Sequence, residues 1–118
     1  MKILFIGGRF KGNLENKFKE KHYVKTAITK NILQRYLSEK FDIYFVDSFN
    51  PGTFEPFADG VIEAIKTIFE KERKSNVIVY TDNSNLKDAV RFLPYKVPVE
   101  SKNKTIESLI EKYSKEKN

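Results

Sequence analysis

The sequence predicts an α/β domain in which a four-stranded parallel sheet, in the order 2-1-3-4, lies between two layers of helices. Two observations favour this Rossmann-like or flavodoxin-like class. Short apolar runs, typical of strands buried on both faces, alternate with stretches of helical periodicity. The chain has 118 residues, a length that fits one domain, and its ten Phe and six Tyr can build a core. We therefore expect residues 1–118 to form a single domain.

The first half of the chain supplies two strands and two helices of this prediction. Residues 2–6 form an apolar run that ends in Gly7-Gly8, which indicates a buried strand. Val24, Ile28, Ile32, Tyr36 and Leu37 recur at helical spacing and predict a helix. Residues 42–47 form the second strand. Apolar residues share one face over 61–69 and predict the second helix.

The second half repeats the alternation. Residues 76–80 predict the third strand, and a helix capped by Ser84 and ended by Pro94 follows it. Residues 95–99 are a weaker fourth strand. Because Pro98 has no N–H to donate, we place this strand at an edge of the sheet. Residues 106–113 predict a last helix, and right-handed crossovers then leave helices on both faces.

Ligands of open parallel sheets bind beyond the carboxyl ends of the strands, and this rule selects the candidate site. Three glycines and two basic residues follow the first strand, where free backbone N–H groups and positive charge could hold a phosphate. Asp82 and Asn83 follow the third strand, although capping of the next helix explains them as well. The ligand-binding candidates are Gly7, Gly8, Arg9, Lys11, Asp82 and Asn83.

Two carboxylates are the catalytic candidates. Asp47 ends the second strand and Glu55 precedes a helix, so the pair could act as nucleophile and positioning group. Stabilisation of the helix N-terminus is an alternative role for Glu55. A response-regulator interpretation of Asp47 needs an acidic pair after the first strand. The chain has Gly7-Gly8-Arg9 there, and we therefore set that interpretation aside.

Charge distribution suggests an anionic partner. The net charge is +6, with +7 in residues 1–40, −5 in 41–70 and +4 in 71–118. Lys17, Lys21 and Lys25 recur at helical spacing and could contact nucleic acid, but a solvated surface explains them too. With no cysteine and one histidine, His22, we expect no metal site and no cofactor. No apolar run could span a membrane and no signal peptide is evident, so we expect a cytoplasmic protein.

Three patches of the chain resemble the nucleoside 2-deoxyribosyltransferase superfamily, which includes the deoxynucleoside monophosphate N-glycosidases. Ile3–Phe10 is similar to the family's first strand and glycine loop, Pro51–Glu55 to its Gly-Thr and Glu segment, and Val77–Asp82 to a strand that ends near an Asp. The resemblance implies that Glu55 is the nucleophile that attacks the anomeric carbon. It also implies that Asp47 holds the sugar, and that Gly8, Arg9 and Lys11 lie near the phosphate.

Three functions follow from these observations. The first is a nucleotide- or nucleoside-binding protein that cleaves or exchanges an N-glycosidic bond. The alternative is a non-catalytic basic module that binds nucleic acid, a nucleotide or an acidic protein. The third is a regulatory or assembly subunit without a ligand. Whether the protein is an enzyme is left open by the sequence, and a homo-oligomer is compatible with all three.

Overall fold

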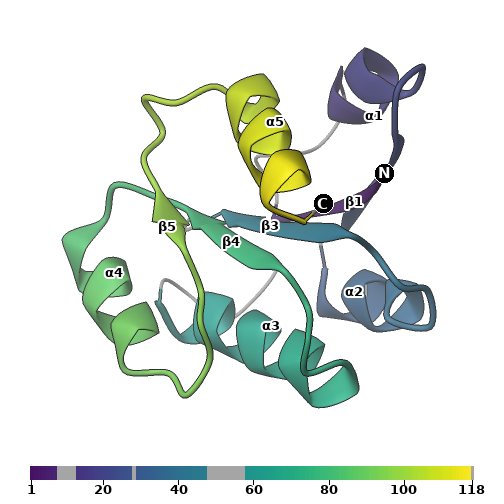
Figure 1. Cartoon of the computed structure of the whole chain (residues 1–118). Helices are drawn as coiled ribbons and strands as arrows, with labels where there is room; N and C mark the ends of the chain where they lie inside the picture. Colours follow the sequence, from purple (N-terminus) through teal and green to yellow (C-terminus); the bar gives the residue numbers. More distant parts are fainter. Residues whose placement is uncertain (8–12, 28, 48–57, 118) are drawn as a thin grey trace.

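The structure is a computed structural model that describes residues 1–7, 13–27, 29–47 and 58–117 (Figure 1). Strands and helices alternate through most of the described chain. In chain order they are β1 (Lys2–Ile6), α1 (Asn13–Phe18), β2 (Tyr23–Ala27), α2 (Lys30–Tyr36), β3 (Ile43–Asp47), α3 (Ala58–Lys71), β4 (Val77–Tyr80), α4 (Ser84–Arg91), β5 (Val99–Glu100) and α5 (Ile106–Lys117).

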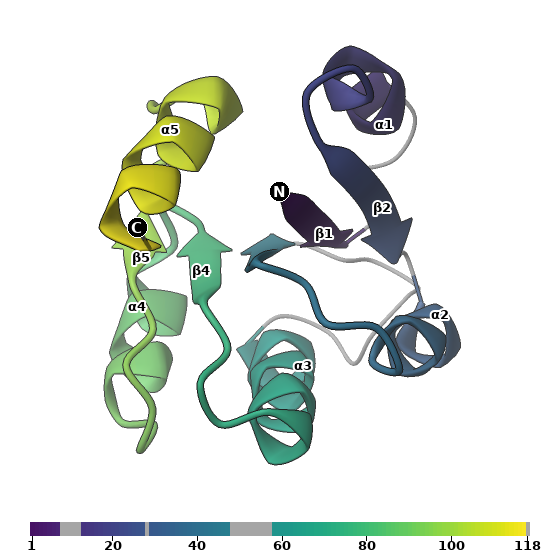
Figure 2. The same cartoon turned by 45° about the vertical axis from the view of Figure 1, so that its right-hand side comes forward.

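The strands form one parallel sheet in the order β2-β1-β3-β4-β5. Helices α1 and α5 cover one face, and α2, α3 and α4 cover the other (Figure 2). This arrangement confirms the predicted three-layer α/β/α class. Since both faces are covered, the central strands carry apolar residues without alternation, and every residue of β3 is buried.

Two apolar clusters, one on each face, hold the layers together. Ile3 and Phe5 of β1 point to the face that α1 and α5 cover, and Phe5 stacks on Phe45 of β3 with ring centroids 5.3 Å apart. Leu4 and Ile6 point to the opposite face and pack with α2, α3 and α4. The sheet is thereby fixed in register, and the carboxyl ends of its strands lie at one edge.

The region 24–37 is not the single helix that its spacing predicts. Residues 23–27 form β2, which pairs with β1, and α2 begins only after Thr29, whose hydroxyl accepts a hydrogen bond from Ile32 N at 3.2 Å. Pairing with β1 along five residues outweighs the helical pattern, and the β-branched Val24 and Thr26 suit a strand. The sheet therefore has five strands in the described residues instead of four.

The extra strand also changes which segments are neighbours. The prediction placed residues 42–47 at the outer side of the first strand. In the structure β2 occupies that outer position, and residues 43–47 form β3, which lies between β1 and β4. The expected edge position of the Pro98 segment is confirmed. Here β5 is two residues long, and Pro98 O accepts from Val79 N at 2.9 Å.

Within the described residues, no helix is both long enough and apolar enough to cross a membrane.

Candidate functional site

Three polar residues are buried at the carboxyl edge of the sheet. Asp47 ends β3, Thr81 follows β4 and Glu100 ends β5, and they are 2%, 0% and 4% exposed. Strand register makes them neighbours, because Asp47 lies opposite Tyr80 and Tyr80 lies opposite Glu100. Burying a charge is costly unless it is paired, so the partners of the two carboxylates define the site.

Asp47 is paired with Lys102, which lies in the loop after β5. The distance from Lys102 Nζ to Asp47 Oδ1 is 2.9 Å, and the lysine side chain is only 26% exposed. The ammonium also lies 5.8 Å from the centroid of the Tyr80 ring. A lysine 55 positions further along the chain therefore neutralises the carboxylate at the centre of this edge.

The main chain around Lys102 is held from two sides. The Asp82 carboxylate accepts hydrogen bonds from Ser101 Oγ at 2.7 Å and from Lys102 N at 3.2 Å. Hydrogen bonding by Ser101 holds the pKa of Asp82 below its usual value. On the other side, Tyr80 Oη lies 2.7 Å from the carbonyl of Lys104 and 3.2 Å from that of Lys102. Burial, together with the nearby Asp47 charge, raises the pKa of Tyr80.

Glu100 joins β5 to α5. Its carboxylate accepts from Lys104 Nζ at 2.7 Å, from Lys112 Nζ at 2.9 Å and from Tyr113 Oη. Burial acts to raise the pKa of Glu100, but these hydrogen bonds outweigh it and lower that pKa to about 2. Both carboxylates at strand ends are thus bound by side chains that follow β5.

The residues after β4 form a helix cap. Asn83 Oδ1 accepts from Leu86 N at 3.0 Å, and Asn83 N donates to Thr81 Oγ1 at 3.0 Å. The N-cap of α4 is therefore Asn83 and not Ser84, one residue before the predicted position. Both ligand-binding candidates here already make contacts within the protein. Asn83 caps α4, and the Asp82 carboxylate accepts hydrogen bonds from Ser101 and Lys102.

β1 is followed by a glycine, whereas β3 and β5 end in carboxylates. Gly7 has a φ of 137°, a conformation that only glycine adopts without strain, and its N–H donates to Ala27 O at 3.0 Å. The other candidates on this loop (Gly8, Arg9 and Lys11) and Glu55 lie outside the described residues. Asp47 is thus the catalytic candidate whose position is known.

The described residues do not bring together a cluster of the side chains that usually bind a divalent cation. Ca²⁺ and Mg²⁺ bind to several oxygen ligands, which carboxylates usually supply. Over residues 1–7, 13–27, 29–47 and 58–117, no group of three or more His, Cys, Asp or Glu could hold a metal ion.

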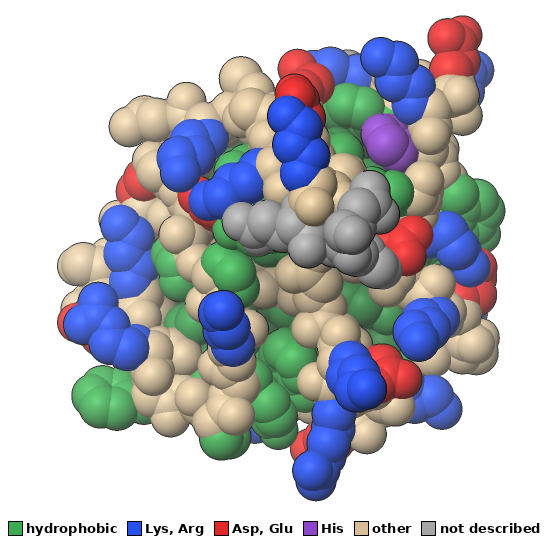
Figure 3. All heavy atoms as spheres, viewed as in Figure 1, with side chains coloured by type: hydrophobic (Ala, Val, Ile, Leu, Met, Phe, Trp, Pro, Cys, Tyr) green, Lys and Arg blue, Asp and Glu red, His purple; other side chains and the backbone are tan. Residues whose placement is uncertain are grey.

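The three lysines proposed for nucleic acid do not share a helix face. Lys17 is on α1 and pairs with Glu107 of α5 at 3.2 Å, Lys21 lies in a turn, and Lys25 is on β2. Figure 3 shows Lys and Arg side chains spread over one face of the molecule and interspersed with Asp and Glu. The helical spacing of these lysines in the sequence is therefore coincidental.

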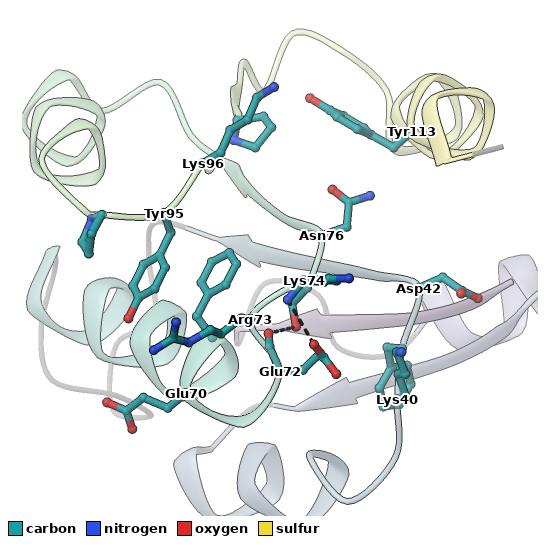
Figure 4. Close-up of a pocket in the computed structure, with 15 residues that line it drawn as sticks. Lys40, Asp42, Glu70, Glu72, Arg73, Lys74, Asn76, Tyr95, Lys96 and Tyr113 are labelled. Carbon is teal, nitrogen blue, oxygen red and sulfur yellow. Dashed lines mark hydrogen bonds between the residues drawn. The ribbon is translucent and has the colours of Figure 1, made fainter.

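A cavity of about 960 Å³ lies at the opposite edge of the sheet, near the amino ends of β3 and β4 (Figure 4). It is lined in part by Phe69 and Tyr95, whose rings stack 4.3 Å apart, and by Lys40, Lys74 and Lys96. Asp47, Thr81 and Lys102 do not line it. This cavity is separate from the polar cluster at the carboxyl edge.

Comparison with known proteins finds similarity in structure alone. No family model and no curated protein matches the sequence. One similar structure is a response regulator from Burkholderia pseudomallei that holds a phosphorylated aspartic acid, a calcium ion and citrate. Its TM-score is 0.69 at 19% identity, over 98% of this chain and 70% of that one. Another is the BeF3-activated DrrB receiver domain, with a TM-score of 0.64 at 17% identity over 97% of both chains.

These neighbours correct the functional predictions. The fold is that of receiver domains, so the resemblance to the nucleoside 2-deoxyribosyltransferase superfamily is wrong. Binding of a nucleotide or nucleoside and cleavage of an N-glycosidic bond are withdrawn with it. The alternative, a basic module for nucleic acid, a nucleotide or an acidic protein, does not fit either. The strand and glycine-loop patches behind the resemblance occur throughout parallel α/β folds, and therefore do not identify one family.

Proposed function

We propose that this chain is a regulatory domain of the receiver type, with Asp47 as its sensing carboxylate and residues 101–104 as its responding loop. The observation that carries the proposal is the 2.9 Å contact between Lys102 and the buried Asp47. The fold adds support, because one neighbour carries a phosphorylated aspartic acid and another is activated by BeF3. The proposal develops the third function considered from the sequence, a regulatory subunit.

The contacts around Lys102 explain how a change at Asp47 would reach the surface. Loss of the Asp47 charge leaves the ammonium of Lys102 without its partner in a half-buried position, and the side chain then gains by turning to water. Its main chain is bound to Asp82 and Tyr80, so that movement would strain both anchors. Residues 101–104 precede α5, and a partner protein that binds at that surface would meet a changed loop conformation.

We propose further that residues 1–118 act as one domain in the cytoplasm. The first support is that β1 and β5, from opposite ends of the chain, belong to one sheet. The second is that the described residues contain no candidate membrane span.

Amide hydrogen exchange in the variant Asp47→Asn tests the proposed function. We expect faster exchange over residues 99–106, because Lys102 loses its charged partner, and unchanged exchange in β1. The matched control is Asp88→Asn, the same chemical change at an exposed carboxylate on α4 that pairs with Arg91 at 4.0 Å. If Asp47→Asn alters exchange only at the end of β3, the responding loop does not exist and the proposal is wrong.

A further inference from the structure

The cavity near the amino ends of β3 and β4 is large enough for a small molecule. Its volume of about 960 Å³ falls in the range of about 300–1,000 Å³ that is typical of small-molecule sites. Its walls come from the loop after α2, the end of α3 with the loop that follows it, the segment between α4 and β5, and α5 (Figure 4). These segments are far apart in the sequence, so only the folded chain forms the cavity.

The inner wall of the cavity is aromatic. Phe41, Phe69 and Tyr113 line it and are 3%, 4% and 4% exposed, and Tyr95 is half-buried beside them. The rings of Phe69 and Tyr95 are nearly parallel, at 5°, with centroids 4.3 Å apart. Aromatic side chains supply a large apolar contact area and pair favourably with other rings. The inner wall therefore suits a flat aromatic ligand.

The outer wall of the cavity carries four basic side chains. Lys40, Arg73, Lys74 and Lys96 are exposed, and they come from three different segments of the chain (Figure 4). Within residues 1–7, 13–27, 29–47 and 58–117, none of the four forms an ion pair with a carboxylate. An anionic ligand would therefore gain positive partners without breaking an existing ion pair.

Acidic residues on the same wall limit the charge that the ligand can carry. Asp42, Glu70 and Glu72 also line the cavity, and these three acids against four bases leave a formal charge of +1. Asp42 Oδ2 accepts from Lys2 N at 2.7 Å and Glu72 Oε1 accepts from Lys74 N at 3.1 Å, so both carboxylates are held in place. They repel a ligand with several negative charges, whereas one carboxylate matches the charge of the wall.

An amide lies between the aromatic and the charged residues. Asn76 precedes β4, is half-buried and lines the cavity, and Figure 4 shows its side chain pointing toward Tyr113. In the part of the chain that the structure describes, its side chain takes part in no hydrogen bond. An amide group has two N–H donors, and a carboxylate in the cavity would accept from them.

We propose that this cavity is a binding site for an aromatic monocarboxylate. The ring lies against Tyr95, and the carboxylate accepts hydrogen bonds from the Asn76 amide and from the ammonium of Lys74. The site is separate from Asp47, so the inference goes beyond the proposed regulatory function and does not depend on it. It also differs from the withdrawn nucleotide site, because the ligand carries one charge and no phosphate.

Titration of the purified chain with naphthalene-2-carboxylate, followed by amide NMR shifts, tests the inference. We expect saturable shifts at residues 40–42, 72–76 and 95–97, which line the cavity or adjoin it. Naphthalene-2-carboxamide has the same ring without the charge, and it should bind about tenfold more weakly, because hydrogen bonds to a charged group are the stronger ones. Acetate has the charge without the ring, and it should give no saturable shift over the same concentrations.

Two variants assign the contacts. Lys74→Met should weaken binding of the carboxylate by about three- to fivefold, as expected for an exposed ion pair, and leave binding of the carboxamide unchanged. Tyr95→Leu should weaken binding of both ligands, since both use the ring. Lys71→Met is the matched control for the lysine, because Lys71 is an exposed lysine at the end of α3 that does not line this cavity.

Three results would overturn the inference. The first is the absence of saturable shifts at the cavity with naphthalene-2-carboxylate. The second is equal affinity for the carboxylate and the carboxamide, which would show that the basic wall does not select an anion. The third is an equal loss of affinity in Lys74→Met and Lys71→Met, which would show that the lysines act through the net charge of the protein and not at this site.

Discussion

Burial of the Asp47 carboxylate costs stability, and it also makes the residue sensitive to a change of charge. Its carboxylate is 2% exposed, and its ion pair with Lys102 helps to offset the cost of this burial. Removing one member of such a pair is costly because the other charge stays buried, whereas replacing both members costs much less. Loss of this pair should therefore alter the structure along the whole carboxyl edge of the sheet.

A double-mutant cycle measures the strength of this pair. Lys102→Met should lower the free energy of unfolding by about 3 kcal/mol, the lower end for a buried pair, since Lys102 is partly exposed. Asp47→Asn should cost less, because the freed lysine can turn to water. Urea unfolding of both single variants and the double variant should give a coupling energy of about 2 kcal/mol.

The exposed pair Lys17–Glu107 provides the comparison for this cycle. Its members are 53% and 52% exposed, and its coupling should lie between about 0 and 1 kcal/mol. Equal coupling energies for the two pairs would mean that the Asp47–Lys102 contact behaves as a surface ion pair.

At the scale of single elements, buried strands are easier to predict from the sequence than the boundaries between strands and helices. β1, β3 and β4 are short, almost continuous apolar runs, and they were predicted within one residue because such runs are typical of strands buried on both faces. Residues 24–27 were assigned to a helix instead of a strand because Val24, Ile28 and Ile32 fit a helical period by chance. Thr29 was the local signal for a helix start, but only the pairing of β2 with β1 shows that a strand precedes it.

The junction of β5 and α5 should give the domain a defined sensitivity to acid. The pKa of Glu100 is lowered to about 2 in the folded chain, against an ordinary value of 4.5. Because the folded value is the lower one, Glu100 contributes stability that is fully present above the ordinary pKa. This stability is lost as pH falls from about 4.5 towards 2.

Urea midpoints of the wild type and Glu100→Gln, measured from neutral pH down to that range, test this expectation. The variant should be less stable at neutral pH, and its stability should fall less steeply with acid. The exposed Glu111→Gln, whose partner is Lys115 at 3.1 Å, should follow the wild type. Parallel acid curves for Glu100→Gln and the wild type would contradict the role given to the three donors around Glu100.

For the whole molecule, the predicted fold class is confirmed and the predicted chemistry is wrong, whereas the functional site at the carboxyl edge of the sheet stays a prediction. Asp47 and Asp82 were selected as candidates from the rule that parallel strands present their carboxyl ends at one edge. Lys102 was missed because it lies far along the chain from Asp47, and only the assembled sheet brings the two together. The absence of an acidic pair after β1 was taken to exclude a response-regulator interpretation of Asp47, but packing of the sheet does not depend on such a pair.

We therefore expect that this chain has the fold of a receiver domain but does not accept a phosphoryl group at Asp47. With acetyl phosphate as donor, transfer to Asp47 would break the bond between phosphorus and the acetate oxygen. It would form a bond from Asp47 Oδ to phosphorus and release acetate. Transfer of a phosphoryl group concentrates negative charge on its oxygens, which metal ions ordinarily stabilise. The ammonium of Lys102, which lies 2.9 Å from Asp47 Oδ1, is already engaged by the carboxylate.

We expect that the chain incubated with acetyl phosphate and Mg²⁺ gains no phosphoryl group, as measured by its intact mass. Asp47→Asn, which lacks the acceptor, sets the background from other side chains. A Mg²⁺-dependent adduct on the wild type that is missing in Asp47→Asn would show that the site recruits a metal despite Lys102. If no adduct forms but exchange over residues 99–106 still responds to Asp47→Asn, the proposed coupling between Asp47 and the loop after β5 operates without phosphoryl transfer.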